Sequence, residues 1–249
     1  MTPKSGYKRG YPVAVLIGIE DDRAVIWNVF SNVVKPEKTL WLDGNREDPR
    51  ALYNFHESII NASRPKLKEG VRSIVLASPP RTNHAQQFIT HVREHHTWLT
   101  QGPNKAAFSE TTASAGTLSE VAALTRTPHF RRLVSDTTSE ETEHLVTMLE
   151  KRLNASSENT VPLYSLEETE DLIFNAWRPG RPKPEYLMLT DKYLQNSREK
   201  SRINRLLQIA SNKNVKTRIV EAESPAGKRL TQLGGLVCLT QIRQPTGRF

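Results

Sequence analysis

Two groups of side chains with metal-binding chemistry occur in the first hundred residues. His91, Glu94 and His95 spell H-x-x-E-H, in which histidines one helical turn apart can hold Zn²⁺ while the glutamate acts as a base. The competing interpretation is a solvated helix edge beside apolar residues. A metalloprotease would need a third ligand from further along the chain, and no glutamate-bearing signature singles one out. The pattern is therefore a hypothesis that depends on what the fold places beside it.

The second group is the acidic run Glu20, Asp21 and Asp22. Nucleases bind Mg²⁺ through carboxylates that face a common cleft, whereas these three residues separate two β-branched runs. They are typical of a hairpin turn, where acidic residues keep the turn soluble. We therefore expect no catalytic residues, no metal and no cofactor. Cys238 lies in an apolar run, which favours a core position.

Basic side chains are concentrated in three segments. The chain has 249 residues and a net charge of +8, an excess that favours polyanionic partners such as RNA. The loop after Trp177 combines cations with prolines, which suits phosphate contact and base stacking, although a stiff surface insertion is the plain alternative. The basic residues of the predicted helix at 197–210 can equally belong to a solvated helix face with no binding role. The predicted RNA-binding or ribosome-binding residues are Lys4, Lys8 and Arg9 of an N-terminal arm, Arg178, Arg181 and Lys183 of the loop, and Arg198, Arg202 and Arg205 of the helix.

Hydrophobic periodicity predicts the elements that must position these residues in the first part of the chain. Alternation and β-branched runs indicate strands, and apolar spacings of three and four indicate helices. Thr138 and Glu141 have the spacing of a helix capping box, so we expect a helix to begin there. The predicted strands are 13–19, 23–30, 38–42, 71–77 and a short one at 98–99, and the predicted helices begin at Pro49 and end before Gly70, then cover 83–95, 118–124, 128–134 and 139–153.

A polar segment, 154–160, divides this region from a second alternation of strands and helices. We expect an extended stretch at 162–164, helices at 166–176, 197–210 and 226–233, and strands at 186–189, 217–220 and 236–240. Alternating elements of this kind form α/β sheets covered by helices. The fold class is therefore α/β with two domains, 1–157 and 158–249.

Composition narrows the setting of the protein. One cysteine excludes an internal disulfide framework and a cysteine-based zinc finger, and it fits a reducing cytosol. No run of about 18 apolar residues is present, so no membrane partner is expected. The apolar run near the N-terminus is short and charges follow it at once, which is unlike a signal peptide. We expect a cytoplasmic protein.

Three stretches resemble the family of Pelota and the archaeal and eukaryotic class 1 release factors. Val71-Arg-Ser-Ile-Val-Leu-Ala-Ser-Pro79 with its following aromatic-bearing helix is similar to the central domain, and residues 223–239, with a Gly pair before the last strand, are similar to the C-terminal end. Tyr164-Ser-Leu-Glu-Glu and Tyr186-Leu-Met-Leu-Thr-Asp191 resemble the third domain between them. The resemblance implies an RNase H-like central domain followed by a small α/β sandwich.

The sequence departs from the family in two places. Family members carry a further N-terminal domain, and here only Met1 to Pro12 precede the first predicted strand, so we expect that domain to be absent. Release factors also carry a Gly-Gly-Gln loop before the first long helix of the central domain. The matching segment, Leu42 to Arg50, has one glycine and no glutamine. Without glutamine to position a water molecule, hydrolysis of peptidyl-tRNA is not expected.

The resemblance implies a non-catalytic translation factor that binds the ribosome or ribosomal RNA, in ribosome rescue or translation quality control, with a translational GTPase as a further partner. Two other classes stay open. One is an RNA-binding module outside translation, because the small domain resembles a fold that ribosomal proteins also use. The other is an enzyme, either a metal-dependent nuclease or a residual peptidyl-tRNA hydrolase.

Overall fold

The computed structural model describes residues 10–102, 105–154, 162–175 and 182–241, and these form two compact units. Unit 1 comprises residues up to Leu67 and Val71–Glu141, and unit 2 comprises Lys68–Gly70 and the chain from Thr142 onward. The α/β class expected from the sequence is confirmed. No helix in the described ranges is long and apolar enough to cross a membrane.

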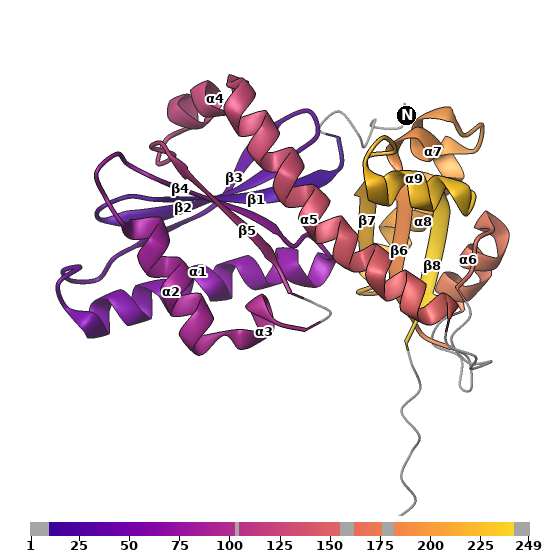
Figure 1. Ribbon diagram of the computed structural model, residues 1–249, viewed down its shortest axis with the longest axis horizontal. Helices are drawn as coiled ribbons and strands as arrows, with labels where there is room; N and C mark the ends of the chain where they lie inside the picture. Colours follow the sequence, from indigo (N-terminus) through magenta and orange to yellow (C-terminus); the bar gives the residue numbers. More distant parts are fainter. Residues whose placement is uncertain (1–9, 103–104, 155–161, 176–181, 242–249) are drawn as a thin grey trace, which may run out of the picture. The chain divides into compact units, whose positions relative to one another are not determined.

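Unit 1 is built on a five-stranded mixed sheet with the order β3-β2-β1-β4-β5 (Figure 1). β1 (Pro12–Ile19) and β2 (Arg23–Phe30) form the expected hairpin, and β3 (Val34–Trp41) continues it antiparallel at the edge. β4 (Ser73–Ser78) and β5 (Ala107–Thr112) extend the other side in parallel with β1. The RNase H-like assignment of this unit stays a prediction.

Alternation along β1 sends its side chains to two separate cores. Val15, Ile17 and Ile19 pack against α1 (Pro49–Glu69) and α2 (His84–His95) on one face of the sheet. Ala14 and Leu16 pack on the other face against α4 (Leu118–Arg126) and the first half of α5 (Pro128–Leu153). Figure 1 shows these helices on opposite sides of the sheet, so unit 1 has three layers.

Unit 2 contains a three-stranded sheet with the order β7-β6-β8. β6 (Pro184–Thr190) pairs in parallel with β7 (Lys216–Val220) and antiparallel with β8 (Leu236–Thr240). The second half of α5 and α9 (Pro225–Gln232) cover one face through a core that includes Leu149, Tyr186 and Leu230. The remaining helices of this unit are α6 (Leu166–Phe174), α7 (Asp191–Asn196) and α8 (Lys200–Asn212).

Several sequence predictions are wrong at particular elements. The strand expected at 98–99 is the short helix α3 (Thr97–Thr100), which buries Leu99 and leaves Trp98 exposed. The helices expected at 128–134 and 139–153 are one continuous helix, α5. Glu141 does not cap a helix, because its buried carboxylate accepts hydrogen bonds from the Arg72 amide and the Ser73 hydroxyl.

The two compact units divide inside α5, between Glu141 and Thr142. Leu145 and Leu149 lie in the core of unit 2, which explains why the second half of the helix belongs there. Residues 155–161 lie outside the described residues. The expected boundary between domains 1–157 and 158–249 therefore stays a prediction.

Candidate nucleic-acid interface

The described part of the predicted basic surface is centred on α8 of unit 2. Arg198 lies in the turn before this helix, and Arg202 and Arg205, three residues apart within it, are neighbours on one side of the helix. The opposite side buries Ile203, Leu206, Leu207 and Ala210. Burial of that apolar side turns the arginines outward, as the sequence predicted.

Arg202 is committed to carboxylates of its own unit. Its Nη2 lies 2.7 Å from Oε2 of Glu170 on α6, and its Nη1 lies 2.8 Å from Oε1 of Glu199. Hydrogen bonds to Glu170 and Glu199 raise the pKa of the Arg202 guanidinium above its ordinary value. With two carboxylates already paired to it, Arg202 ties α6 to α8, and Arg198 and Arg205 are the better candidates for phosphate contact.

Arg205 adjoins an exposed ring that the sequence analysis missed. Its guanidinium carbon lies 5.8 Å from the ring centroid of Phe174, whose relative exposure is 36%. Lys213 Nζ donates hydrogen bonds to the carbonyl oxygens of Ile173 and Phe174, 3.0 and 2.7 Å away, so a second cation lies at the same helix end. An exposed ring beside cations can stack on an unpaired base next to a phosphate. The sequence did carry a signal for this exposed ring, because Phe174 falls outside the spacing of the buried residues of α6.

The other predicted residues divide by where they lie in the chain. Lys183 is exposed immediately before β6, and its carbonyl accepts a hydrogen bond from the Gln241 amide at 2.7 Å. The remaining five, Lys4, Lys8, Arg9, Arg178 and Arg181, lie outside the described residues. In the sequence, the predicted basic loop begins shortly after Phe174.

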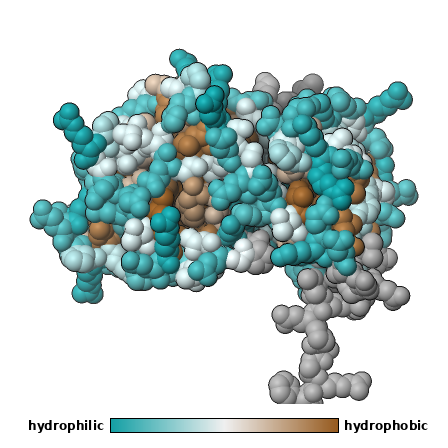
Figure 2. Space-filling model, in the orientation of Figure 1, coloured by the Kyte–Doolittle hydropathy of each residue, from teal (hydrophilic) through white to brown (hydrophobic). Residues whose placement is uncertain are grey.

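Two exposed tryptophans in unit 1 have the same pairing with arginine. Trp41 at the end of the edge strand β3 is 63% exposed, and the Arg23 guanidinium carbon lies 5.3 Å from its ring centroid. Trp98 is 41% exposed, and Arg64 lies 5.4 Å from its ring. On the face that Figure 2 draws, the surface is mainly hydrophilic and hydrophobic residues gather in small separate patches. Single exposed rings of this kind suit stacking better than a protein interface.

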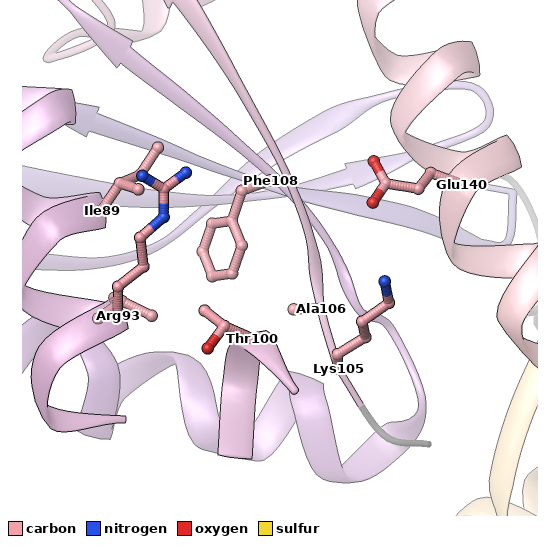
Figure 3. Close-up of a pocket in the computed structure, with 8 residues that line it drawn as sticks. Ile89, Arg93, Thr100, Lys105, Ala106, Phe108 and Glu140 are labelled. Atoms are coloured by element: carbon pink, nitrogen blue, oxygen red, sulfur yellow. The ribbon is translucent and has the colours of Figure 1, made fainter. Parts of the chain in front are cut away.

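A small pocket in unit 1 also carries charge. It has a volume of about 220 Å³, with an apolar floor that includes Phe108 and Ala106 and charged groups at Arg93, Lys105 and Glu140. Figure 3 shows the Phe108 ring between Arg93 and Lys105, with the amine of Lys105 directed towards Glu140. This volume is below that of most small-molecule sites, and we assign it no ligand.

Residues 42–50, which the sequence resemblance set against the release-factor loop, are held against their own unit. Arg46 Nε donates a hydrogen bond to the Asp21 carbonyl at 2.8 Å and its Nη2 donates to the Glu20 carbonyl. The guanidinium also lies 5.5 Å from the Phe55 ring centroid. Burial lowers the pKa of Arg46, against the opposing effect of the neighbouring aspartates. Arg46 therefore anchors this segment to the β1–β2 turn.

The acidic turn itself is used in structural contacts. Glu20 Oε1 accepts a hydrogen bond from the Ala115 amide at 3.0 Å, and Asp21 Oδ1 lies 2.8 Å from Nε2 of His84. Among the described residues, the three metal-ligating side chains that converge are elsewhere, at Glu57, His91 and His96. The fold therefore does not assemble a nuclease-like carboxylate cluster at this turn.

Comparisons with family models and with curated proteins give no match. Solved structures do match. Archaeal Pelota, from a model of the ribosome-bound protein with ABCE1, aligns with 98% of this chain and 65% of its own length, at 17% identity and a TM-score of 0.53. The chain has the fold of Pelota. Dom34 of S. cerevisiae, a translation termination-like factor described as interacting with Hbs1, aligns with 94% of the chain and 64% of its own, at 18% identity and a TM-score of 0.48. The archaeal termination factor aRF1 aligns with 92% of this chain and 62% of its own length, at 14% identity and a TM-score of 0.32.

The chain thus spans slightly less than two thirds of Pelota and Dom34. The part that aligns with Pelota includes nearly all of both units, in the same order along the chain. The resemblance seen in residues 71–79, 164–168, 186–191 and 223–239 therefore led to the right fold. At this level of identity the likeness concerns the fold, and the site residues have to be argued from this chain alone.

Proposed function

We propose that the chain is a non-catalytic, ribosome-associated factor of translation quality control that acts in the cytoplasm, in the manner of ribosome rescue. The observation that carries the proposal is the agreement with ribosome-bound Pelota over 98% of the chain. The net charge of +8 and the outward-facing arginines of α8 add an attraction for ribosomal RNA. The anchored segment at 42–50, which lacks glutamine, supports a role without peptide release.

Co-sedimentation with purified ribosomes over a series of salt concentrations tests the proposal. A ribosome factor pellets with ribosomes in a saturable manner, and an excess of free ribosomal RNA does not displace it completely. Complete displacement by free RNA would favour the alternative of an RNA-binding module outside translation. The exposed Arg23–Trp41 and Arg64–Trp98 pairs support that alternative. Release of peptide from peptidyl-tRNA on programmed ribosomes would contradict the non-catalytic part.

A translational GTPase is proposed as a second partner. The support is the Pelota fold of both units together with the family resemblance. A pull-down with the GTPase in its GTP-bound form at micromolar concentration tests it, and absence of binding there would remove this partner while leaving ribosome binding intact.

Replacement of Arg178, Arg181 and Lys183 by glutamine is expected to weaken ribosome binding and to flatten its salt dependence. Each neutralised phosphate contributes about 0.7 to 0.9 to the slope of log affinity against log salt, so three contacts contribute roughly 2 to 3. Binding of the triple variant between low and physiological salt measures this slope.

The matched control removes three exposed cations from unit 1, Arg126, Arg131 and Arg132. Both variants lose the same net charge, so a non-specific attraction would change the two slopes equally. An unchanged slope in the loop variant would assign the loop to a surface insertion and leave Arg198 and Arg205 as the candidates on α8.

A further inference from the structure

Three ligand-type side chains from separate elements converge in unit 1. Glu57 lies on α1, His91 lies on α2, and His96 follows the end of α2. Nε2 of His91 is 3.1 Å from Oε1 of Glu57, and Nε2 of His96 is 2.5 Å from the same oxygen. One ligand atom from each residue lies within 4.8 Å of those of the other two. Both histidines are 7% exposed and the Glu57 side chain is 26% exposed, so the group is largely buried and open to solvent on the glutamate side.

This arrangement matches the donor set of a zinc site. Two imidazole nitrogens and one carboxylate oxygen bind Zn²⁺ at about 2.0 to 2.2 Å, which places tetrahedral ligand atoms about 3.3 Å apart. The 3.1 Å distance between Glu57 Oε1 and His91 Nε2 is close to that spacing, whereas the 2.5 Å distance to His96 Nε2 would have to lengthen. Because the three ligand atoms lie within 4.8 Å of one another, side-chain rotations would seat an ion between them. Three protein ligands leave the fourth position for water.

The surroundings provide access and further polar groups. A cavity of about 450 Å³ opens between α1 and α2 and is lined by Tyr53, His56, Gln86, Gln87, Thr90 and His91, among others. His56 is 2% exposed, and its Nε2 has no hydrogen-bond partner within the described part of the chain. Its ring centroid is 5.0 Å from that of His91. The cavity thus leads from the surface to one of the three converging residues.

We propose that Glu57, His91 and His96 bind one Zn²⁺ ion that ties α1 to the C-terminal end of α2. The H-x-x-E-H pattern supplies only one of these ligands. His95 Nε2 is 3.9 Å from Glu94 Oε2 and its side chain is 43% exposed, so the second histidine of the pattern turns away to the surface. The site comes from the meeting of α1 with α2 and not from the motif.

Binding requires a change at His96 that can be observed. Nδ1 of His96 now accepts a hydrogen bond from the Trp98 indole at 3.3 Å, and its Nε2–H donates to Glu57. When Nε2 binds the ion, the ring proton moves through solvent to Nδ1, and the indole must release its contact. Trp98 is 41% exposed and has room to turn, so its fluorescence reports metal binding.

The experiment titrates the full chain, freed of metal by a chelator, with Zn²⁺ by calorimetry and by tryptophan fluorescence. We expect one ion per chain and a change in emission that is lost in Trp98→Phe. Glu57→Gln, His91→Asn and His96→Asn should each weaken binding at least about 100-fold, because loss of a partner behind a ligand alone costs 10- to 100-fold. Co²⁺ should give the visible absorption of a four-coordinate site.

The matched controls are Glu94→Gln and His95→Gln, which alter the neighbouring motif residues and should leave zinc affinity unchanged. Glu57→Gln keeps the size of the side chain and an oxygen that accepts from both histidines, so it tests ligation in a folded protein. Absence of stoichiometric binding at micromolar Zn²⁺, or equal loss in the His95 variant, would overturn the proposal. Weak binding that no ligand variant changes would also overturn it and indicate surface adsorption only.

Discussion

Replacement of Arg152 by alanine is expected to destabilise unit 2 by about 3 kcal/mol, because it leaves a largely buried carboxylate without its main partner. Arg152 lies near the end of α5 and is 8% exposed. Its Nη2 is 2.5 Å from Oε2 of Glu185, and its Nη1 donates to the Thr240 carbonyl at 2.5 Å. It thereby joins α5 to both β6 and β8. Chemical denaturation followed by circular dichroism measures the loss.

Arg229→Ala is the matched control. Arg229 Nε also lies 2.5 Å from a glutamate, Glu150 of the same helix α5, but both side chains are more than one-third exposed. An exposed ion pair contributes little to stability, because water screens the charges, so this variant should be close to the parent protein. Arg152→Lys should fall between the two, since an ammonium cannot reproduce the two directed bonds of the guanidinium. Equal stability of the Arg152 and Arg229 alanine variants would contradict the assignment.

The thiol of Cys238 is expected to react with a thiol reagent more slowly than an exposed cysteine by a factor on the order of a thousand or more. Burial raises the pKa of Cys238 to about 12, so the reactive thiolate is about a thousandfold rarer at pH 8 than in an ordinary thiol. The residue is 0% exposed in β8, which pairs with β6, and its backbone also pairs with Leu163. Labelling kinetics at pH 8 check this expectation.

Labelling of Cys238 also reports the opening of unit 2 specifically. A loss of about 3 kcal/mol in Arg152→Ala should raise the labelling rate roughly a hundredfold where labelling follows opening. Because the thiol pKa is higher in the folded state, its contribution to stability is complete below about pH 8.5 and declines as the pH rises towards 12. Cys238→Ala should remove that part of the alkaline destabilisation. Rapid labelling of the native protein would show that the strand is accessible.

Most regular elements were predictable because one periodic pattern dominated each of them. The β1–β2 hairpin follows β-branched runs and α1 follows helical spacing, both with little ambiguity. Ser165 caps α6 as expected, because its hydroxyl oxygen accepts a hydrogen bond from the Glu168 amide at 3.1 Å. β5 was missed because it is an edge strand of largely polar residues that pairing with β4 stabilises. Its conformation depends on a neighbour more than 25 residues away in sequence, which local patterns do not encode.

The continuous course of α5 shows how a tertiary contact overrides a local signal. Thr138 and Glu141 have capping-box spacing, yet the carboxylate of Glu141 is used by the amide of Arg72 and the hydroxyl of Ser73. Thr137, which is buried, donates its hydroxyl to the Leu133 carbonyl at 2.6 Å and so stays within the helix. A side chain can cap a helix only if it has no other partner. The Glu141 carboxylate is instead hydrogen-bonded to the backbone of Arg72 and the side chain of Ser73 in unit 1.

The sequence by itself determined the α/β class, most of the strands and helices of both regions, the positive charge and the outward side of α8. Only the tertiary structure decided which arginines are available for phosphate contact. Arg202 forms ion pairs with Glu170 and Glu199, whereas Arg205 lies over the Phe174 ring. The tertiary structure also brings together Glu57, His91 and His96 from separate elements, instead of the residues of the H-x-x-E-H motif. Periodicity fixes which side of an element faces inward, but the partner of each side chain depends on how separate elements pack together.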